Sequence, residues 1–142
     1  MIVEFTIAWV VEPKQGGMTR IISSGGKHFA RRYQPVKVKR NAETLALLMA
    51  PHRPAVPLDG PIRAHYEFKY GWLSSHGKKV RALGKLWKDT RPDTGNLAKN
   101  LEDVLERTGF VTNDARICAV RIEKYFCDSP GLFVRLTTID EK

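Results

Sequence analysis

The sequence predicts a small mixed α/β fold of the α+β kind, in which one mixed β-sheet packs against two main helices. Over residues 62–70 apolar and polar side chains alternate strictly, which is the period-two pattern of a half-buried strand. Leu97, Leu101, Val104 and Leu105 follow an i, i+4, i+7, i+8 pattern, which places them on one face of an amphipathic helix. A chain with elements of both periods is expected to bury the apolar sheet face under the helices.

The N-terminal half is expected to contribute a strand, a hairpin and the first helix. Residues 2–11 predict a strand with Val3, Phe5, Ile7 and Trp9 on one face. Residues 12–35 are rich in glycine and basic side chains and predict either a basic hairpin or a solvated loop. A helix is expected from about 36 to 49, because prolines lie near both of its ends.

The C-terminal half is expected to contain the alternating strand, a basic excursion, the second helix and two strands. A proline-rich connector over 51–61 precedes the alternating strand, and residues 71–91 interleave lysine and arginine with Trp72 and Trp87. The second helix should begin after Pro92, with Asp93 or Thr94 as its cap, and end near Gly109. Strands are expected at 116–126 and 132–138, joined by a Ser-Pro-Gly turn. At 142 residues, we expect one domain over 1–142.

The charge is strongly positive and unevenly distributed. The net charge is +9, and residues 61–91 carry eight Lys/Arg against two acids, whereas 92–142 carry seven against nine. This arrangement is typical of basic segments that hold a polyanion over an acidic site, although a merely soluble basic protein is the plain alternative. The two cysteines form no Cys-x-x-Cys pair, which argues against a zinc cluster. No apolar run reaches about 20 residues, and Glu4 interrupts the apolar N-terminus, so we expect a cytoplasmic protein with no membrane partner.

A group of polar side chains recurs along the second helix. Asp93, Asn96, Lys99 and Asp103 are separated by steps of three and four residues, so they share one side of the helix. A solvated face would have the same pattern. Asp114, which follows the helix, adds a further carboxylate to this group, and its presence favours a functional site.

The stretch from Arg91 to Asp114 resembles the core motif of the RusA family of Holliday junction resolvases, the crossover junction endodeoxyribonucleases. That motif reads Lys/Arg-Pro-Asp-x-Asp-Asn-Leu-x-Lys, followed by a helix and an Asp-Asp pair. Arg91-Pro92-Asp93, Asn96-Leu97, Lys99 and Asp103 stand in their family positions, and Asp114 matches the second member of the pair. Softer matches extend the resemblance to nearly the full length: Pro13-Lys14-Gln15, Tyr33-Gln34-Pro35 and Leu58-Asp59-Gly60-Pro61.

Two positions depart from the family pattern. Gly95 replaces the second motif aspartate, and Asn113 replaces the first member of the later pair. In the family, both motif aspartates and the last aspartate of the pair bind the metal. Of these three, only Asp93 and Asp114 remain in this chain.

The resemblance implies a homodimer that cuts branched DNA at four-way junctions with Mg²⁺, for which Mn²⁺ can substitute. By family position, Asp93, Lys99 and Asp114 are the catalytic residues, with Asp93 and Asp114 as the metal ligands. Asn96 and Asp103 would lie around these ligands and orient them without binding the metal. The basic residues expected to contact DNA phosphates come from the hairpin and from the excursion: Lys14, Arg20, Lys27, Arg31, Arg32, Lys78, Lys79, Arg81, Lys85 and Arg91.

Three function classes remain open from the sequence. The first is a metal-dependent junction endonuclease. The second is a RusA-like protein that binds junctions with weakened or lost cleavage, because Gly95 removes a motif carboxylate. The third is a nuclease of the Pro-Asp…Asp/Glu-x-Lys type, of which Pro92-Asp93 fits the first half and Asp114-Ala115-Arg116 only approximates the second.

Overall fold

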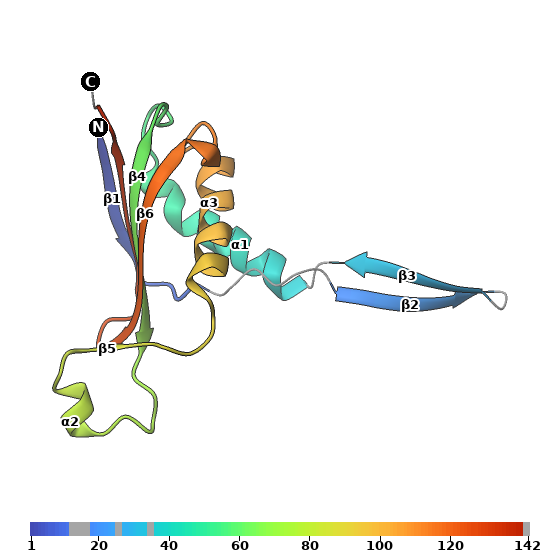
Figure 1. The fold of residues 1–142 in the computed structure, drawn as a ribbon, viewed down its shortest axis with the longest axis horizontal. Coiled ribbons are helices and arrows are strands. Elements are labelled where there is room, and N and C mark those ends of the chain that lie inside the picture. Colours follow the sequence, from blue (N-terminus) through green and yellow to red (C-terminus); the bar gives the residue numbers. More distant parts are fainter. Residues whose placement is uncertain (12–17, 25–26, 34–35, 141–142) are drawn as a thin grey trace.

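A five-stranded mixed sheet with helices on one face forms the body of the protein in the computed structural model (Figure 1). The structure describes the backbone of residues 1–11, 18–24, 27–33 and 36–140, and the side chains of 1–11 and 40–140. The strand order is β1-β7-β4-β6-β5, and only the β4/β6 pair is parallel. The strands are β1 (Ile2–Ile7), β4 (Ile62–Gly71), β5 (Lys85–Trp87), β6 (Ile117–Cys127) and β7 (Gly131–Thr138).

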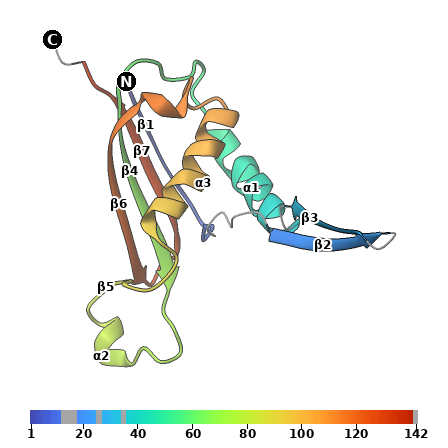
Figure 2. The same ribbon diagram turned by 45° about the vertical axis from the view of Figure 1, so that its right-hand side comes forward.

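Two long helices cover one face of this sheet, as the sequence predicts (Figure 2). They are α1 (Val36–Met49) and α3 (Thr94–Arg107). Three shorter helical segments lie in the connections: η1 (Ala50–His52), α2 (Lys78–Arg81) and η2 (Asp114–Arg116). In the part of the chain that the structure describes, no helix is long and apolar enough to cross a membrane.

The predicted basic hairpin is present as a separate two-stranded antiparallel sheet. It consists of β2 (Met18–Ser24) and β3 (Lys27–Tyr33), paired from Met18↔Tyr33 to Ser24↔Lys27. The hairpin lies beyond the N-terminal end of α1, away from the five-stranded sheet (Figures 1 and 2).

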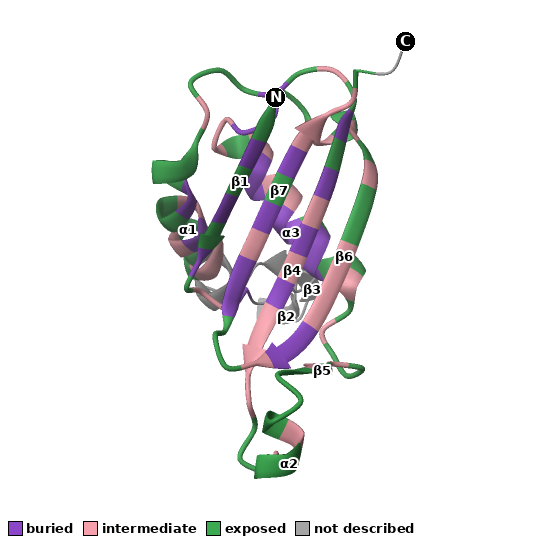
Figure 3. Cartoon of the chain, turned by 90° about the vertical axis from the view of Figure 1, so that its left-hand side faces the viewer, coloured by how far each residue is buried: buried purple, intermediate pink, exposed green. Residues whose placement is uncertain are grey.

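The alternating pattern of β4 is confirmed. Ile62, Ala64, Tyr66 and Phe68 are all at most 1% exposed and face the helices, whereas the residues between them lie on the opposite side. Side chains from β1, β7 and α3 complete the same core, and buried positions alternate with more exposed ones along the strands (Figure 3). Among the described residues no helix covers the other face, on which the intervening polar side chains of β4 lie.

The first strand is shorter than the sequence predicts. β1 ends at Ile7, the partner of Leu132 in β7, and Trp9 packs against the core outside the strand. The ladder ends here because Gly131 begins β7 at a close approach, where an added Cβ would lie 2.3 Å from the Ile7 carbonyl oxygen. The Ser-Pro-Gly turn therefore leaves residues 8–11 without a strand partner in β7.

Both ends of α3 follow the predicted signals. Asp93 is the N-cap, although its side chain makes no capping hydrogen bond. At the C-terminal end Gly109 has a φ of 85°, and the amides of Gly109 and Phe110 donate to the carbonyls of Glu106 and Leu105. This is the Schellman arrangement, and it explains the need for glycine at this position.

The parallel pairing of β4 with β6 requires a long crossover connection. Residues 72–116 supply it and contain α2, β5, α3 and η2. The segment around α2 projects beyond the ends of β4 and β6, while α3 returns along the sheet (Figure 1). The crossover thus carries both the basic excursion and the acidic motif.

Candidate functional site

A cavity of about 350 Å³ lies between α3 and the start of β6. The sequence-predicted residues Lys99, Asp103 and Asp114 line it, together with Gly95. Its remaining wall is formed by Ala98, Glu102, Ala115 and Ile117. The cavity therefore gathers one ammonium and three carboxylates contributed by two separate segments of the chain.

Asp93 and Asn96 lie at the entrance of α3, and neither lines this cavity. Both side chains are exposed. The assignment of Asp93 as a metal ligand stays a prediction. Asp114 shares the cavity with residues from the first turn of α3, at Gly95, to Asp103.

Lys124 of β6 fixes the entrance of α3, a role that the sequence does not reveal. Its Nζ donates to the carbonyl oxygen of Thr90 and, at 2.7 Å, to that of Pro92. These carbonyls immediately precede the helix, so the strand fixes where Asp93 and Gly95 begin. A lysine on a strand ten residues after Asp114 gives no sequence signal of such a contact.

The segment that carries Asp114 is held from two sides. The Asp114 amide donates to Glu106 Oε1 at 3.2 Å, which ties it to the last turns of α3. Asn113, the residue that departs from the family pattern, caps η2 because its side-chain oxygen accepts from the Ala115 amide at 2.8 Å. An asparagine at this position therefore has a structural role that needs no charge.

The Leu58-Asp59-Gly60-Pro61 match also has a structural explanation. Asp59 Oδ1 accepts from the Thr112 hydroxyl at 2.9 Å and pairs with Arg116 Nε at 3.2 Å. The Thr112 hydrogen bond, the Gly60 amide and the Arg116 charge lower the pKa of the Asp59 carboxyl. Backbone hydrogen bonds join the same two segments, because the Leu58 amide donates to the Phe110 carbonyl and the Thr112 amide donates to the Leu58 carbonyl. This stretch anchors the loop that presents Asp114.

Glu102 is a site residue that the sequence reading missed. Burial raises the pKa of its carboxyl, and the nearby Asp114 and Asp103 carboxylates raise it further, whereas the Tyr66 hydroxyl opposes the shift. Glu102 thus lies within electrostatic range of both acids. The helical spacing 95, 99, 102 offered the signal, since it places Glu102 on the same face as Gly95 and Lys99.

The donor set of the cavity fits a hard divalent cation. Mg²⁺ prefers carboxylate oxygens, usually takes only one or two from a protein, and keeps several waters. Asp114 and Glu102 supply such oxygens, and Lys99 supplies a positive charge that can contact an anionic substrate in the same cavity.

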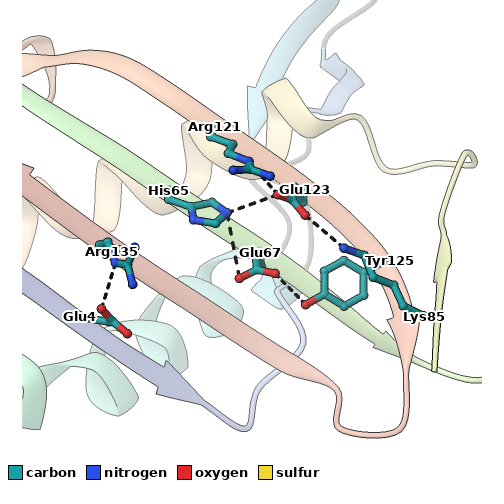
Figure 4. A network of polar contacts seen from close by, with 8 residues as sticks. All are labelled: Glu4, His65, Glu67, Lys85, Arg121, Glu123, Tyr125 and Arg135. Carbon is teal, nitrogen blue, oxygen red and sulfur yellow. Dashed lines mark hydrogen bonds and ion pairs between the residues drawn. The ribbon is translucent and has the colours of Figure 1, made fainter.

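Among the described residues, a second group of possible metal ligands lies on the open face of the sheet (Figure 4). It consists of His65, Glu67 and Glu123, whose ligand atoms all lie within 4.8 Å of one another. His65 Nε2 lies 3.5 Å from Glu123 Oε1 and 4.0 Å from Glu67 Oε2. These residues come from the neighbouring strands β4 and β6, which are paired in parallel.

Cationic and hydroxyl donors already occupy these two carboxylates. Glu123 pairs with Arg121 at 2.8 Å and with Lys85 at 3.3 Å, and Glu67 accepts from the Tyr125 hydroxyl at 2.8 Å (Figure 4). Burial alone would raise the pKa of Glu123, but the Lys85 hydrogen bond and the surrounding positive charges hold it below its ordinary value. We interpret the cluster as an ion-pair network.

The basic residues predicted to contact DNA have different surroundings. Lys78 and Lys79 are exposed on α2, and Arg91 is exposed before α3. Arg81 donates to the carbonyls of His76 and Leu73, at 2.8 and 3.2 Å, so it also closes its own loop. Lys85 is paired with Glu123, as noted above. Lys14 lies outside the described residues, and so do the side chains of Arg20, Lys27, Arg31 and Arg32.

The two tryptophans of the basic excursion differ in accessibility. Trp72 donates from Nε1 to Asp128 at 2.6 Å and packs edge-on to His76, so the fold already uses it. Trp87 is 60% exposed, with Lys85 Nζ 4.1 Å from its ring centroid. Trp87 is thus the more accessible of the two rings, and Lys85 lies over one of its faces.

Comparisons with known proteins agree with the family that the motif indicates. A family model described as "Endodeoxyribonuclease RusA" matches residues 11–137. A curated relative from Bacillus subtilis (strain 168), named "Uncharacterized protein YqaN", is 26% identical over 133 residues. That match covers 90% of this chain and 92% of the relative.

Proposed function

Because this chain belongs to the RusA endodeoxyribonuclease family, we propose that it is a metal-dependent endonuclease that binds and resolves four-way DNA junctions. The observation that carries the proposal is the cavity in which Lys99 meets Asp114, inside the segment that the family model covers. The described part of the crossover also carries exposed lysines on α2.

Within the site, each side chain has a proposed role. By family position Asp93 and Asp114 are the proposed metal ligands, and Asn96 and Asp103 support them. When bound, Mg²⁺ or its substitute Mn²⁺ supplies positive charge at the scissile phosphate and makes a nearby water more acidic. Lys99 stabilises the negative charge that develops on the phosphate oxygens, because it lines the same cavity and carries a positive charge.

We propose that the protein acts as a homodimer on branched DNA. A four-way junction presents two equivalent scissile phosphates, so a two-fold symmetric pair of sites matches its geometry. The basic hairpin and the excursion would hold the flanking phosphates, whose number sets how strongly affinity depends on salt. A cytoplasmic location and a single functional domain over 1–142 belong to the same proposal.

The second candidate is a junction-binding protein with weakened cleavage. Gly95 lines the cavity and adds no carboxylate there, which is the observation that favours it. The remaining nuclease type loses support, because Arg116 pairs with Asp59 and does not line the cavity.

A cleavage assay separates these candidates. The protein is incubated with four-way, duplex and flap DNA in Mg²⁺ or Mn²⁺, and binding is measured on the same substrates in Ca²⁺. The leading proposal expects metal-dependent cuts confined to the four-way junction. Junction binding without cuts would support the second candidate, and cleavage of plain duplex would contradict both.

A further inference from the structure

The distribution of carboxylates in the cavity differs from the family pattern. Asp93 is the N-cap of α3 and does not line the cavity, and Gly95 leaves its position in the cavity without a carboxylate. Asp114 is tied to Glu106 and lies within electrostatic range of Glu102. Carboxylate oxygens bind Mg²⁺ at about 2.0–2.1 Å, so two ligands of one ion must lie close together. Glu102 and Asp114 line the same cavity, so they can meet this condition.

Glu102 also projects from the correct face of the helix. Residues 95, 99 and 102 follow an i, i+4, i+7 pattern, so they lie above one another on α3. All three line the cavity. Glu102, two turns beyond Gly95, can therefore supply the negative charge that the glycine does not bring to the cavity.

The hydroxyl of Tyr66 gives an independent reason to assign a role to Glu102. Tyr66 is fully buried on β4, and no described group makes a hydrogen bond of normal geometry to its hydroxyl. Glu102 nevertheless lies near enough to add to the effect of burial in raising the pKa of this tyrosine. A buried hydroxyl that lacks a hydrogen-bond partner is costly. The Glu102 carboxylate can supply that partner when its side chain turns toward the Tyr66 hydroxyl.

Metal-binding carboxylates are commonly held by such a donor. When one carboxylate oxygen faces an ion, the other is usually hydrogen-bonded by a neighbouring group that fixes its direction. The Tyr66 hydroxyl, reaching α3 from the underlying sheet, is suited to hold one Glu102 oxygen in this way.

We propose that Glu102 joins Asp114 as a ligand of the divalent ion, in the role that the family assigns to motif aspartates, and that Tyr66 orients it. Mg²⁺ keeps several waters beside its carboxylate ligands, and these waters leave room for substrate phosphate oxygens. This inference rests on the proposed function, because it concerns the same cavity. Asp93 keeps the role proposed above, and Glu102 supplies the carboxylate that Gly95 lacks.

Direct measurement of Mn²⁺ binding, without DNA, tests the assignment. Free Mn²⁺ is followed by electron paramagnetic resonance during titration of the wild-type protein and of the Glu102→Gln, Asp114→Asn and Asp93→Asn variants. We expect Glu102→Gln to weaken Mn²⁺ binding at least tenfold, as Asp114→Asn and Asp93→Asn should at the two ligands proposed above. Glu43 is exposed on α1, and Glu43→Gln is the matched control that should bind as wild type does.

Two further variants guard against a merely structural effect. Tyr66→Phe should weaken Mn²⁺ binding several-fold while retaining a cooperative thermal transition. Adding Gly95→Asp to Glu102→Gln should restore binding, because a carboxylate returns to the cavity. The inference is overturned if Glu102→Gln binds Mn²⁺ within twofold of wild type. That result leaves the junction-cleavage test of the proposed function unaffected, since that assay reads DNA products.

Discussion

Replacing Gly95 with aspartate should raise metal-dependent cleavage. Position 95 lines the cavity, and a Cβ built there would meet no heavy atom within 4 Å. Gly95 does not have a positive φ, so an L-residue fits its backbone without strain. The new carboxylate would supply another oxygen ligand beside Lys99. We expect at least a tenfold faster single-turnover rate, which corresponds to about 1.4 kcal/mol of barrier.

The same change should stabilise the fold slightly. Aspartate in the first turn of α3 favours the helix dipole, and the loss of glycine lowers the entropy of the unfolded chain. Together these effects are worth about 0.5–1 kcal/mol, or roughly 2–4 °C in Tm for a domain of this size. Thermal unfolding followed by circular dichroism measures the shift.

The assay is single-turnover cleavage of a labelled four-way junction across a Mg²⁺ titration. Gly95→Asn is the matched control, because it has the size of aspartate without its charge and should give no gain in rate. If Gly95→Asp is folded and stable but cuts no faster than wild type at any Mg²⁺ concentration, the reasoning about the missing carboxylate is refuted.

Three other predictions concern binding and stability. Lys78→Glu with Lys79→Glu should weaken junction binding and flatten its salt dependence by about 1.8 units of slope, roughly 0.9 per phosphate contact; an unchanged slope contradicts the assignment. Lys124→Met removes two hydrogen bonds to the α3 entrance and should cost about 1–2 kcal/mol of unfolding free energy in urea titrations, and no loss would show that the contact is not needed. Leu101→Ala should cost about 2–5 kcal/mol because Leu101 is fully buried, whereas Leu47→Ala, 75% exposed, should cost under about 0.5; equal losses would disprove the packing argument.

The elements with strong local patterns were predictable. The alternation in β4 and the apolar stripe of α3 each report one buried face, and burial fixed those faces as expected. Gly109 was predictable as a helix end because only a left-handed conformation completes that cap. The end of β1 was not, because it depends on where its partner β7 begins.

The site was only partly predictable for the same reason. Lys99, Asp103 and Asp114 were found from helical spacing and from the motif, and they share one cavity. Lys124 and Tyr66 reach the site from strands distant in sequence, and local patterns do not encode such contacts. Their contribution depends on the order of the strands in the sheet.

The most direct test of the central claim is to map the cuts on a four-way junction. Each of the four strands is labelled in turn, and products are resolved after incubation of the wild-type protein or Asp114→Asn with Mg²⁺. We predict paired, symmetric cuts in two opposing strands by the wild-type protein, and no cuts by Asp114→Asn although it still binds the junction. Cuts of equal extent by both proteins would contradict the account.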